Sequence, residues 1–236
     1  MPDEKSFPAS TAEFDFNKTV QRMEVKWFLK PFLGINEYVN RPLASPFVRA
    51  FARTRVTPNQ LTFLALFLGL AGAFFFFTGQ PSAFVIGGIL AQLSSVVDCA
   101  DGMLARARGQ QNEFGAFLDM VFDRINEFFL IAGFVSGYYW QSGRILFLLL
   151  GSAALGLYFL HASLFYLIKN YLKDGNKAET AELRGLFMFL TFLFAVINRP
   201  DFGIGVLLVS TAGLNAFLIY DLFRAGWRRA VLKSVD

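Results

Sequence analysis

The chain has 236 residues, of which 55% are hydrophobic and 30 are phenylalanine, a composition that excludes an ordinary soluble domain and is typical of an integral membrane protein. Its single cysteine, Cys99, excludes an internal disulfide. The net charge of +4 comes from lysines and arginines that flank apolar runs, so we predict no nucleic-acid partner.

The N-terminal region is polar and mixed in charge. Within it, residues 14–33 carry apolar side chains at helical spacing, from Phe16 to Trp27, with charged residues between them. This pattern predicts an amphipathic helix that lies either on the cytoplasmic leaflet or against the cytoplasmic face of the protein itself. We assign residues 1–55 to a cytoplasmic N-terminal segment that contains this interfacial helix.

The first long apolar run has a well-specified helix start. Thr57 can act as the N-cap, Pro58 suits the first helical position, and Gln60 can complete a capping box. A helix needs about 20 mostly apolar residues to cross a membrane. Six such runs are separated by short polar breaks: 57–78, 82–108, 112–140, 143–172, 180–198 and 201–226.

The fold prediction is therefore all-α, a polytopic membrane protein whose six transmembrane helices follow an N-terminal amphipathic or juxtamembrane helical segment. The membrane domain covers residues 56–228, and residues 229–236 form a cytoplasmic tail. Lysines and arginines gather in the N-terminal segment, after the second and fourth runs and at the C-terminus, whereas only Arg144 and Arg199 lie on the other side. This asymmetry predicts an integral protein of the cell (inner) membrane with both termini and the end of the second helix in the cytoplasm.

Four aspartates lie at the end of the second run and the start of the third. Asp98 and Asp101 are three residues apart and Asp119 and Asp123 are four apart, so each pair shares a helix face. A charged residue in the membrane costs about 2.5 to 3.5 kcal/mol, so these carboxylates need compensation. Because the short turn at 108–112 makes the two helices antiparallel neighbours, we expect the pairs to converge on a hard divalent cation such as Mg²⁺ or Mn²⁺.

Other residues of the same stretch suit a phosphate-bearing substrate, which commonly completes the coordination of Mg²⁺. Arg106 lies on roughly the same helix face as Asp98 and can bind phosphate oxygens through its forked donors. Gly102 and Ala105 leave room for a nucleotide or for a facing backbone, and Gly115 does the same on the next helix. The stretch therefore predicts a site for a phosphate or diphosphate.

The pattern D-x-x-D-G-x-x-A-R, then eight residues, then G-x-x-x-D-x-x-x-D runs from Asp98 to Asp123 and matches the signature of the CDP-alcohol phosphotransferase family at every position. The chain resembles that family over most of residues 40–226. The resemblance implies a two-metal centre of Mg²⁺ or Mn²⁺ with Asp98, Asp101 and Asp119 as the main ligands. It implies that Asp123 is the general base and also reaches the second ion.

The resemblance also implies the reaction. The acceptor hydroxyl would attack the phosphorus distal to cytidine, release CMP and form a phosphodiester, in a homodimeric enzyme within the lipid bilayer. It places four residues at the nucleotide and phosphates: Gly102, Ala105, Arg106 and Gly115. Asn59 and Thr62 are further contacts for the diphosphate, although helix capping and packing explain these two residues equally well.

The substrates are open at this level. The predicted activity is transfer of a substituted phosphate group from CDP-diacylglycerol to an alcohol in phospholipid biosynthesis. Residues 40–62 resemble the di-inositol-phosphate phosphate synthase branch, for which CDP-inositol and inositol phosphate are the substrates. An ion transporter and an inactive scaffold are the remaining alternatives.

Three lysines follow the fourth run, Lys169, Lys173 and Lys177. They bind an acceptor phosphate or are ordinary cytoplasmic-side residues. In the third run, Glu127 either extends the polar pocket that the four aspartates form or pairs with a basic residue. Gly133 and Gly137 form a GxxxG pair, which marks either a close contact between helices or, as we expect for a lone motif, ordinary packing inside the bundle.

Overall fold

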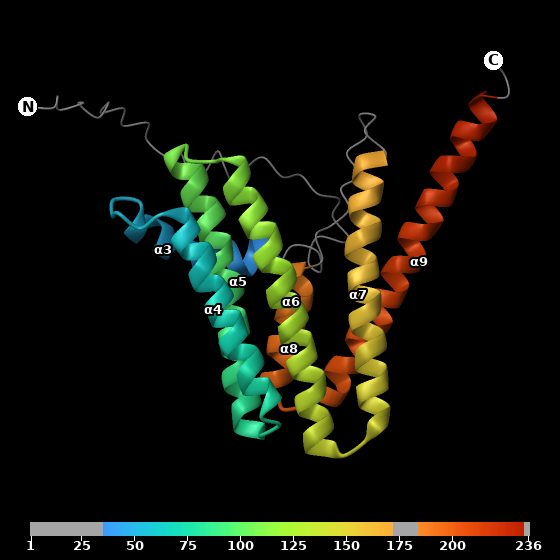
Figure 1. Ribbon diagram of the computed structural model, residues 1–236, viewed down its shortest axis with the longest axis horizontal. Coiled ribbons are helices and arrows are strands. Elements are labelled where there is room, and N and C mark those ends of the chain that lie inside the picture. The colour runs from blue at the N-terminus through green and yellow to red at the C-terminus, as the bar shows by residue number, and fades with distance from the viewer. Residues whose placement is uncertain (1–34, 172–183, 234–236) are drawn as a thin grey trace, which may run out of the picture.

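The computed structural model describes residues 35–171 and 184–233, and this part of the chain is all-helical. The end of α5, the start of α6 and the ends of α7 and α9 lie at one end of the bundle, the upper end in Figure 1. The elements are η1 (Asn36–Asn40), α3 (Arg41–Phe51), α4 (Pro58–Phe77), α5 (Pro81–Arg108), α6 (Glu113–Ser142), α7 (Ile145–Tyr171), α8 (Arg184–Val196) and α9 (Pro200–Lys233).

The described part of each of the six predicted runs is mainly helical, but the count of six spans is not confirmed. Within the described residues, four segments are long and apolar enough to cross a membrane: Pro58–Phe77, Pro81–Arg108, Ile145–Leu164 and Pro200–Tyr220. Helix α6 is absent from this set because charged side chains recur in its first half, between Glu113 and Glu127. The described part of helix α8 has 13 residues, fewer than the roughly 20 that a span needs.

The segment before α4 also differs from the prediction. The amphipathic helix predicted at 14–33 lies outside the described residues, whereas η1 and α3 form a juxtamembrane helix at a position that the sequence analysis did not specify. Ala44 and Val48 of α3 are buried in an apolar cluster with Leu104 of α5. Helix α3 contains Pro46 in its interior, a position that normally argues against a helix.

The start of α4 is as predicted. The Thr57 hydroxyl accepts a hydrogen bond from the Gln60 backbone N–H at 3.3 Å, and the Gln60 side-chain oxygen accepts one from the Thr57 N–H at 2.9 Å. Pro58 occupies the first helical position. This capping box fixes where α4 begins, and it places Asn59 and Thr62 on the first turns of that helix.

A tight turn joins α5 to α6 and makes them antiparallel neighbours. Gly109 ends α5 with φ +63°, a left-handed conformation that glycine adopts without a steric penalty. Asn112 then caps α6, since its side-chain oxygen accepts a hydrogen bond from the Gly115 N–H at 2.7 Å. The turn therefore brings the two halves of the aspartate motif together at the same end of the bundle.

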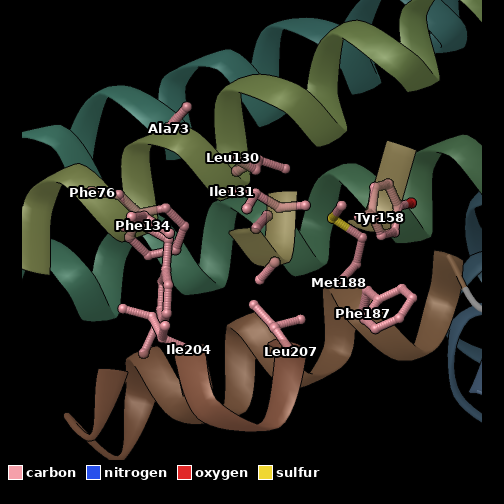
Figure 2. Packing of buried hydrophobic residues seen from close by; sticks show 14 of the residues in the cluster. Ala73, Phe76, Leu130, Ile131, Phe134, Tyr158, Phe187, Met188, Ile204 and Leu207 are labelled. Atoms are coloured by element: carbon pink, nitrogen blue, oxygen red, sulfur yellow. The ribbon is translucent and has the colours of Figure 1, made fainter. Parts of the chain in front are cut away.

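The apolar core lies farther from that end. The rings of Phe76, Phe84 and Phe134 are in mutual contact, with centroids 5.3 to 5.5 Å apart. Figure 2 shows Phe76 and Phe134 together, with Ile204 and Leu207 of α9 below them. The core holds α4, α5, α6 and α9 together and positions the aspartate-bearing ends of α5 and α6.

The GxxxG pair lies at a close contact between two helices, whereas the sequence favoured ordinary packing. A Cβ at Gly137 would overlap the carbonyl oxygen of Phe76, and a Cβ at Gly133 would lie 2.6 Å from the carbonyl oxygen of Ala73. The backbones of α4 and α6 are therefore in direct contact, which only glycine permits at these positions.

Candidate metal and nucleotide site

Three of the four motif aspartates meet at the interface of α5 and α6. Asp98, Asp119 and Asp123 each offer a carboxylate oxygen, and these oxygens lie within 4.8 Å of one another. Three like charges so close repel one another unless a cation lies between them. Because all three donors are hard carboxylate oxygens, the group fits Mg²⁺ or Mn²⁺.

The fourth aspartate, Asp101, is not in that close group. It is only 5% exposed, and its Oδ2 has no hydrogen-bond partner among the described residues. A buried carboxylate oxygen in this state needs a cation or another donor to compensate its lost hydration. The assignment of Asp101 as a metal ligand stays a prediction.

A cavity of about 210 Å³ lies beside the aspartates, between the start of α4, the end of α5 and the start of α6. It is lined by every residue predicted to contact the nucleotide or the phosphates, and by two of the aspartates: Asn59, Thr62, Asp101, Gly102, Ala105, Arg106, Gly115 and Asp119. The fold thus gathers side chains from three helices around one space. Their binding roles remain predictions.

The cavity also has lining residues that the sequence pattern did not suggest: Pro58, Gln110, Gln111, Asn112 and Ala116. They belong to the first turns of α4 and α6 and to the turn between α5 and α6. Of these residues, only Asn112 could have been identified from the sequence, because an asparagine before an amphipathic run marks a helix start.

The electrostatics of the cavity suit an anion. Helices α4 and α6 both begin at its wall, and the free N–H groups and dipole of a helix N-terminus favour negative charge. Arg106 adds a full positive charge, and its guanidinium folds over Gly102, with Nη1 3.4 Å from the position of a Cβ there. A Cβ at Gly115 would lie 3.3 Å from Oδ1 of Asn59. At both positions, glycine leaves space that a larger side chain would fill.

Asp119 connects the two features. Among the described residues it alone belongs both to the three-carboxylate group and to the cavity lining, whereas Asp98 and Asp123 do not line the cavity. A diphosphate in the cavity would therefore contact a cation at Asp119. Asp123 would contact the same cation from outside the cavity lining.

Arg108 has a role that the sequence did not reveal. Its guanidinium donates to the backbone carbonyl oxygens of Val56 at 2.5 Å and of Thr54 at 2.8 Å, and also to that of Phe51. These bonds tie the end of α5 to the loop that leads into α4 and Asn59. The prediction counted Arg108 only as a cytoplasmic-side charge, because no local pattern reveals acceptors more than 50 residues away.

Two further predictions have different outcomes. Glu127 is fully buried and forms an ion pair with Arg124, with Oε2 and Nη1 2.7 Å apart, which confirms the pairing alternative. Lys169 falls in the last turns of α7, while Lys173 and Lys177 lie outside the described residues. The acceptor site therefore stays a prediction.

Comparison with known proteins gives a family and a similar fold. The model of the family described as CDP-alcohol phosphatidyltransferase matches residues 55–218, more than half of the chain. Among solved structures, the fold is similar to that of Mycobacterium tuberculosis phosphatidylinositol phosphate synthase with CDP-DAG bound. The TM-score is 0.63 at 20% identity, over 76% of this chain and 92% of that one.

Curated relatives match over a shorter part. An archaetidylinositol phosphate synthase of Pyrococcus horikoshii is 32% identical over 89 residues, 38% of this chain and 46% of the relative. A bifunctional IPC transferase and DIPP synthase of Aquifex aeolicus is 36% identical over 94 residues, 40% of this chain and 21% of the relative. The match therefore spans less than half of the length of either relative.

Proposed function

Because the chain belongs to the CDP-alcohol phosphatidyltransferase family, we propose that it transfers a substituted phosphate group from a CDP-linked donor to the hydroxyl of an alcohol. The reaction releases CMP and forms a phosphodiester. One observation carries the proposal: Asp119 is common to the three-carboxylate group and to the cavity beside it. This arrangement suits a diphosphate that is held by a protein wall on one side and by a cation on the other.

The donor occupies the cavity in this proposal. Arg106 and the N-termini of α4 and α6 bind the diphosphate oxygens, while Gly102 and Gly115 leave space for the nucleotide. Asp98, Asp119 and Asp123 hold a divalent ion, and Asp101 holds a second one with Asp119. When bound, Mg²⁺ or Mn²⁺ stabilises the charge that develops on the transferring phosphoryl group and on the leaving oxygen.

Asp123 takes the proton of the acceptor hydroxyl. It is 9% exposed, belongs to the carboxylate group and does not line the donor cavity. In an in-line displacement the attacking oxygen approaches opposite the leaving CMP, so the base should lie away from the nucleotide. The position of Asp123 supports this role, and a well-placed carboxylate suffices as the base.

We propose CDP-diacylglycerol as the donor and an inositol phosphate as the acceptor. The similar solved structure has CDP-DAG bound, and relatives are named archaetidylinositol phosphate synthase and phosphatidylinositol phosphate synthase. Lys169, Lys173 and Lys177 then bind the acceptor phosphate. The second candidate uses CDP-inositol with the same acceptor, and the likeness to the bifunctional IPC transferase and DIPP synthase favours it.

We propose that six helices cross the cell (inner) membrane within a domain of residues 56–228. The packing of the two helices that are not candidate spans supports this. Helix α6 packs against α4 and α7, and α8 packs against α5 and α9. In this proposal the chain is a homodimer, and residues 1–55, residues 229–236 and the site all face the cytoplasm.

The experiment that tests the function measures CMP. Purified protein is incubated with Mg²⁺ or Mn²⁺, labelled CDP-diacylglycerol or CDP-inositol, and a panel of alcohols that includes inositol phosphate, glycerol phosphate, serine and inositol. We expect CMP and a labelled phosphodiester from CDP-diacylglycerol with inositol phosphate. If only CDP-inositol reacts, the lipid donor is wrong; if no pair releases CMP, the enzymatic proposal fails.

A further inference from the structure

Three helices are joined by a buried group of hydrogen bonds below the site. The Ser94 hydroxyl of α5 donates to the carbonyl oxygen of Ala65 of α4 at 2.7 Å. The Asn126 side-chain amide of α6 donates to the same carbonyl oxygen at 3.2 Å and to the Ser94 oxygen at 3.3 Å. Asn126 and Ser94 are 6% and 4% exposed. We call Ala65, Ser94 and Asn126 the polar clamp.

The polar clamp lies one helical turn from the carboxylates. Ser94 precedes Asp98 by four residues on α5, and Asn126 follows Asp123 by three on α6. Residues three or four apart share a helix face, and one turn is a rise of about 5.4 Å. The clamp therefore fixes the separation of α5 and α6 immediately beside the point where they present the carboxylates.

We propose that Ser94 and Asn126 are positioning residues that hold the carboxylates at the separation that a cation of fixed size requires. The inference rests on the proposed metal site. Without a cation, the charges of Asp98 and Asp123 push α5 and α6 apart. Lipid gives no hydrophobic force between helices, so interhelical hydrogen bonds and close packing must resist this repulsion. A preformed site of this kind binds its ion without first moving two helices.

Gly69 of α4 shows how tightly the clamp is built. A Cβ at this position would overlap Oδ1 of the Asn126 amide and lie 2.5 Å from its Cγ. The amide is therefore in close contact with the backbone of α4 at Gly69. Gly69→Ala would displace the amide from Ser94 while leaving every hydrogen-bonding group of the clamp unchanged.

The neighbouring Ser95 supplies a matched control. It is 8% exposed, and its hydroxyl accepts a hydrogen bond from the Asn40 side chain at 2.9 Å, so it ties α5 to η1 instead of to α6. Ser95→Ala removes the same chemical group, one residue away, from an equally buried position. It should loosen the fold without altering the separation of α5 and α6.

The test is Mn²⁺ binding to the purified full chain in the absence of donor, followed by electron paramagnetic resonance. We expect Ser94→Ala, Asn126→Leu and Gly69→Ala each to weaken Mn²⁺ binding by about tenfold, the low end of what outer partners of a metal site contribute. Ser95→Ala should stay within about twofold of the wild type, since additivity holds for independent sites. Circular dichroism and gel filtration identify the variants that keep their fold. If Asn126→Leu or Gly69→Ala does not fold, Ser94→Ala still tests the inference, because it removes only one hydroxyl group.

A second measurement separates positioning from general loss of structure. In CMP release, the clamp variants should need about tenfold more Mn²⁺ for half-maximal rate yet approach the wild-type rate at saturating Mn²⁺. Equal effects of Ser94→Ala and Ser95→Ala on Mn²⁺ binding, or no effect of the clamp variants, would overturn the inference and leave the proposed function intact. Failure of the wild type to bind Mn²⁺ would overturn the metal site and the inference together.

Discussion

Arg108 at the end of α5 donates a hydrogen bond from Nη1 to the backbone carbonyl oxygen of Val56 at 2.5 Å. The same guanidinium reaches two more carbonyls of that loop, those of Phe51 and Thr54. The loop leads directly into the capping box of α4, where Asn59 faces the cavity. One side chain therefore fixes two walls of the cavity relative to each other.

We expect Arg108→Gln to weaken donor binding and to lower the free energy of unfolding by about 1 to 3 kcal/mol, the usual cost of losing hydrogen bonds to a charged group. Binding of a CDP-linked donor and thermal unfolding in detergent measure the two effects. Arg55→Gln is the matched control, because Arg55 is an exposed arginine next to the same loop. Equal behaviour of both variants would contradict a specific role for Arg108.

Asp123→Asn should reduce CMP release by about 10³-fold, within the range that general-base catalysis contributes. Donor affinity should change little, because Asp123 lies outside the cavity lining. Asp101→Asn should have the opposite profile, with a larger loss of donor affinity, since Asp101 lines the cavity. Rates at saturating donor and equilibrium donor binding distinguish the two, and matching profiles would contradict the assigned roles.

Removal of divalent ions with a chelator should abolish CMP release. Mg²⁺ or Mn²⁺ should restore it and Zn²⁺ should not, because the site offers carboxylate oxygens instead of nitrogen or sulfur ligands. The measurement is the rate of CMP formation after the chelator is removed and each ion is added back. Full activity of the ion-free protein would refute the metal dependence.

Gly137→Ala should destabilise the bundle by more than about 2 kcal/mol, because the added methyl group overlaps the Phe76 carbonyl and forces α4 and α6 apart. Gly156→Ala is the control, since a Cβ at Gly156 meets nothing within 4 Å among the described residues. There the change should be neutral or stabilising by up to about 1 kcal/mol through helix propensity. Thermal unfolding of the two variants checks the contrast.

Arg124→Ala should destabilise the fold by about 3 kcal/mol, because it leaves the fully buried Glu127 without the guanidinium that lies 2.7 Å away. Glu127→Gln removes the buried charge that the Arg124 guanidinium compensates. The double variant Arg124→Ala with Glu127→Gln should therefore be more stable than Arg124→Ala alone. Unfolding midpoints of the three variants test this, and additive losses would show that the two side chains do not interact.

The sequence was informative where local rules apply. Thr57 and Gln60 form the predicted capping box, and the short turn after Arg108 brings Asp98 and Asp119 to one interface. Helical periodicity and turn length suffice for such predictions, because each depends on residues only a few positions apart.

The features that were missed depend on distant partners. Arg108 and Asn126 both donate to backbone carbonyls that lie more than 50 residues away, and any residue can supply a carbonyl. The helix around Pro46 forms because its apolar face is buried against α5, which overrides local propensity. The predicted count of six spans is not confirmed, in part because α6 combines the charges of the site with a membrane-length helix.

The shared position of Asp119 has a thermodynamic consequence. A group that contacts two ligands links their binding equilibria, so the factor by which the cation raises donor affinity must equal the factor by which the donor raises cation affinity. Asp119→Asn should shrink both factors equally, whereas a change at Arg106 should alter donor affinity with little effect on the cation alone. If the proposed site is correct, the occupancy of the donor site at low cation concentration is set by the supply of the metal as much as by the supply of the nucleotide.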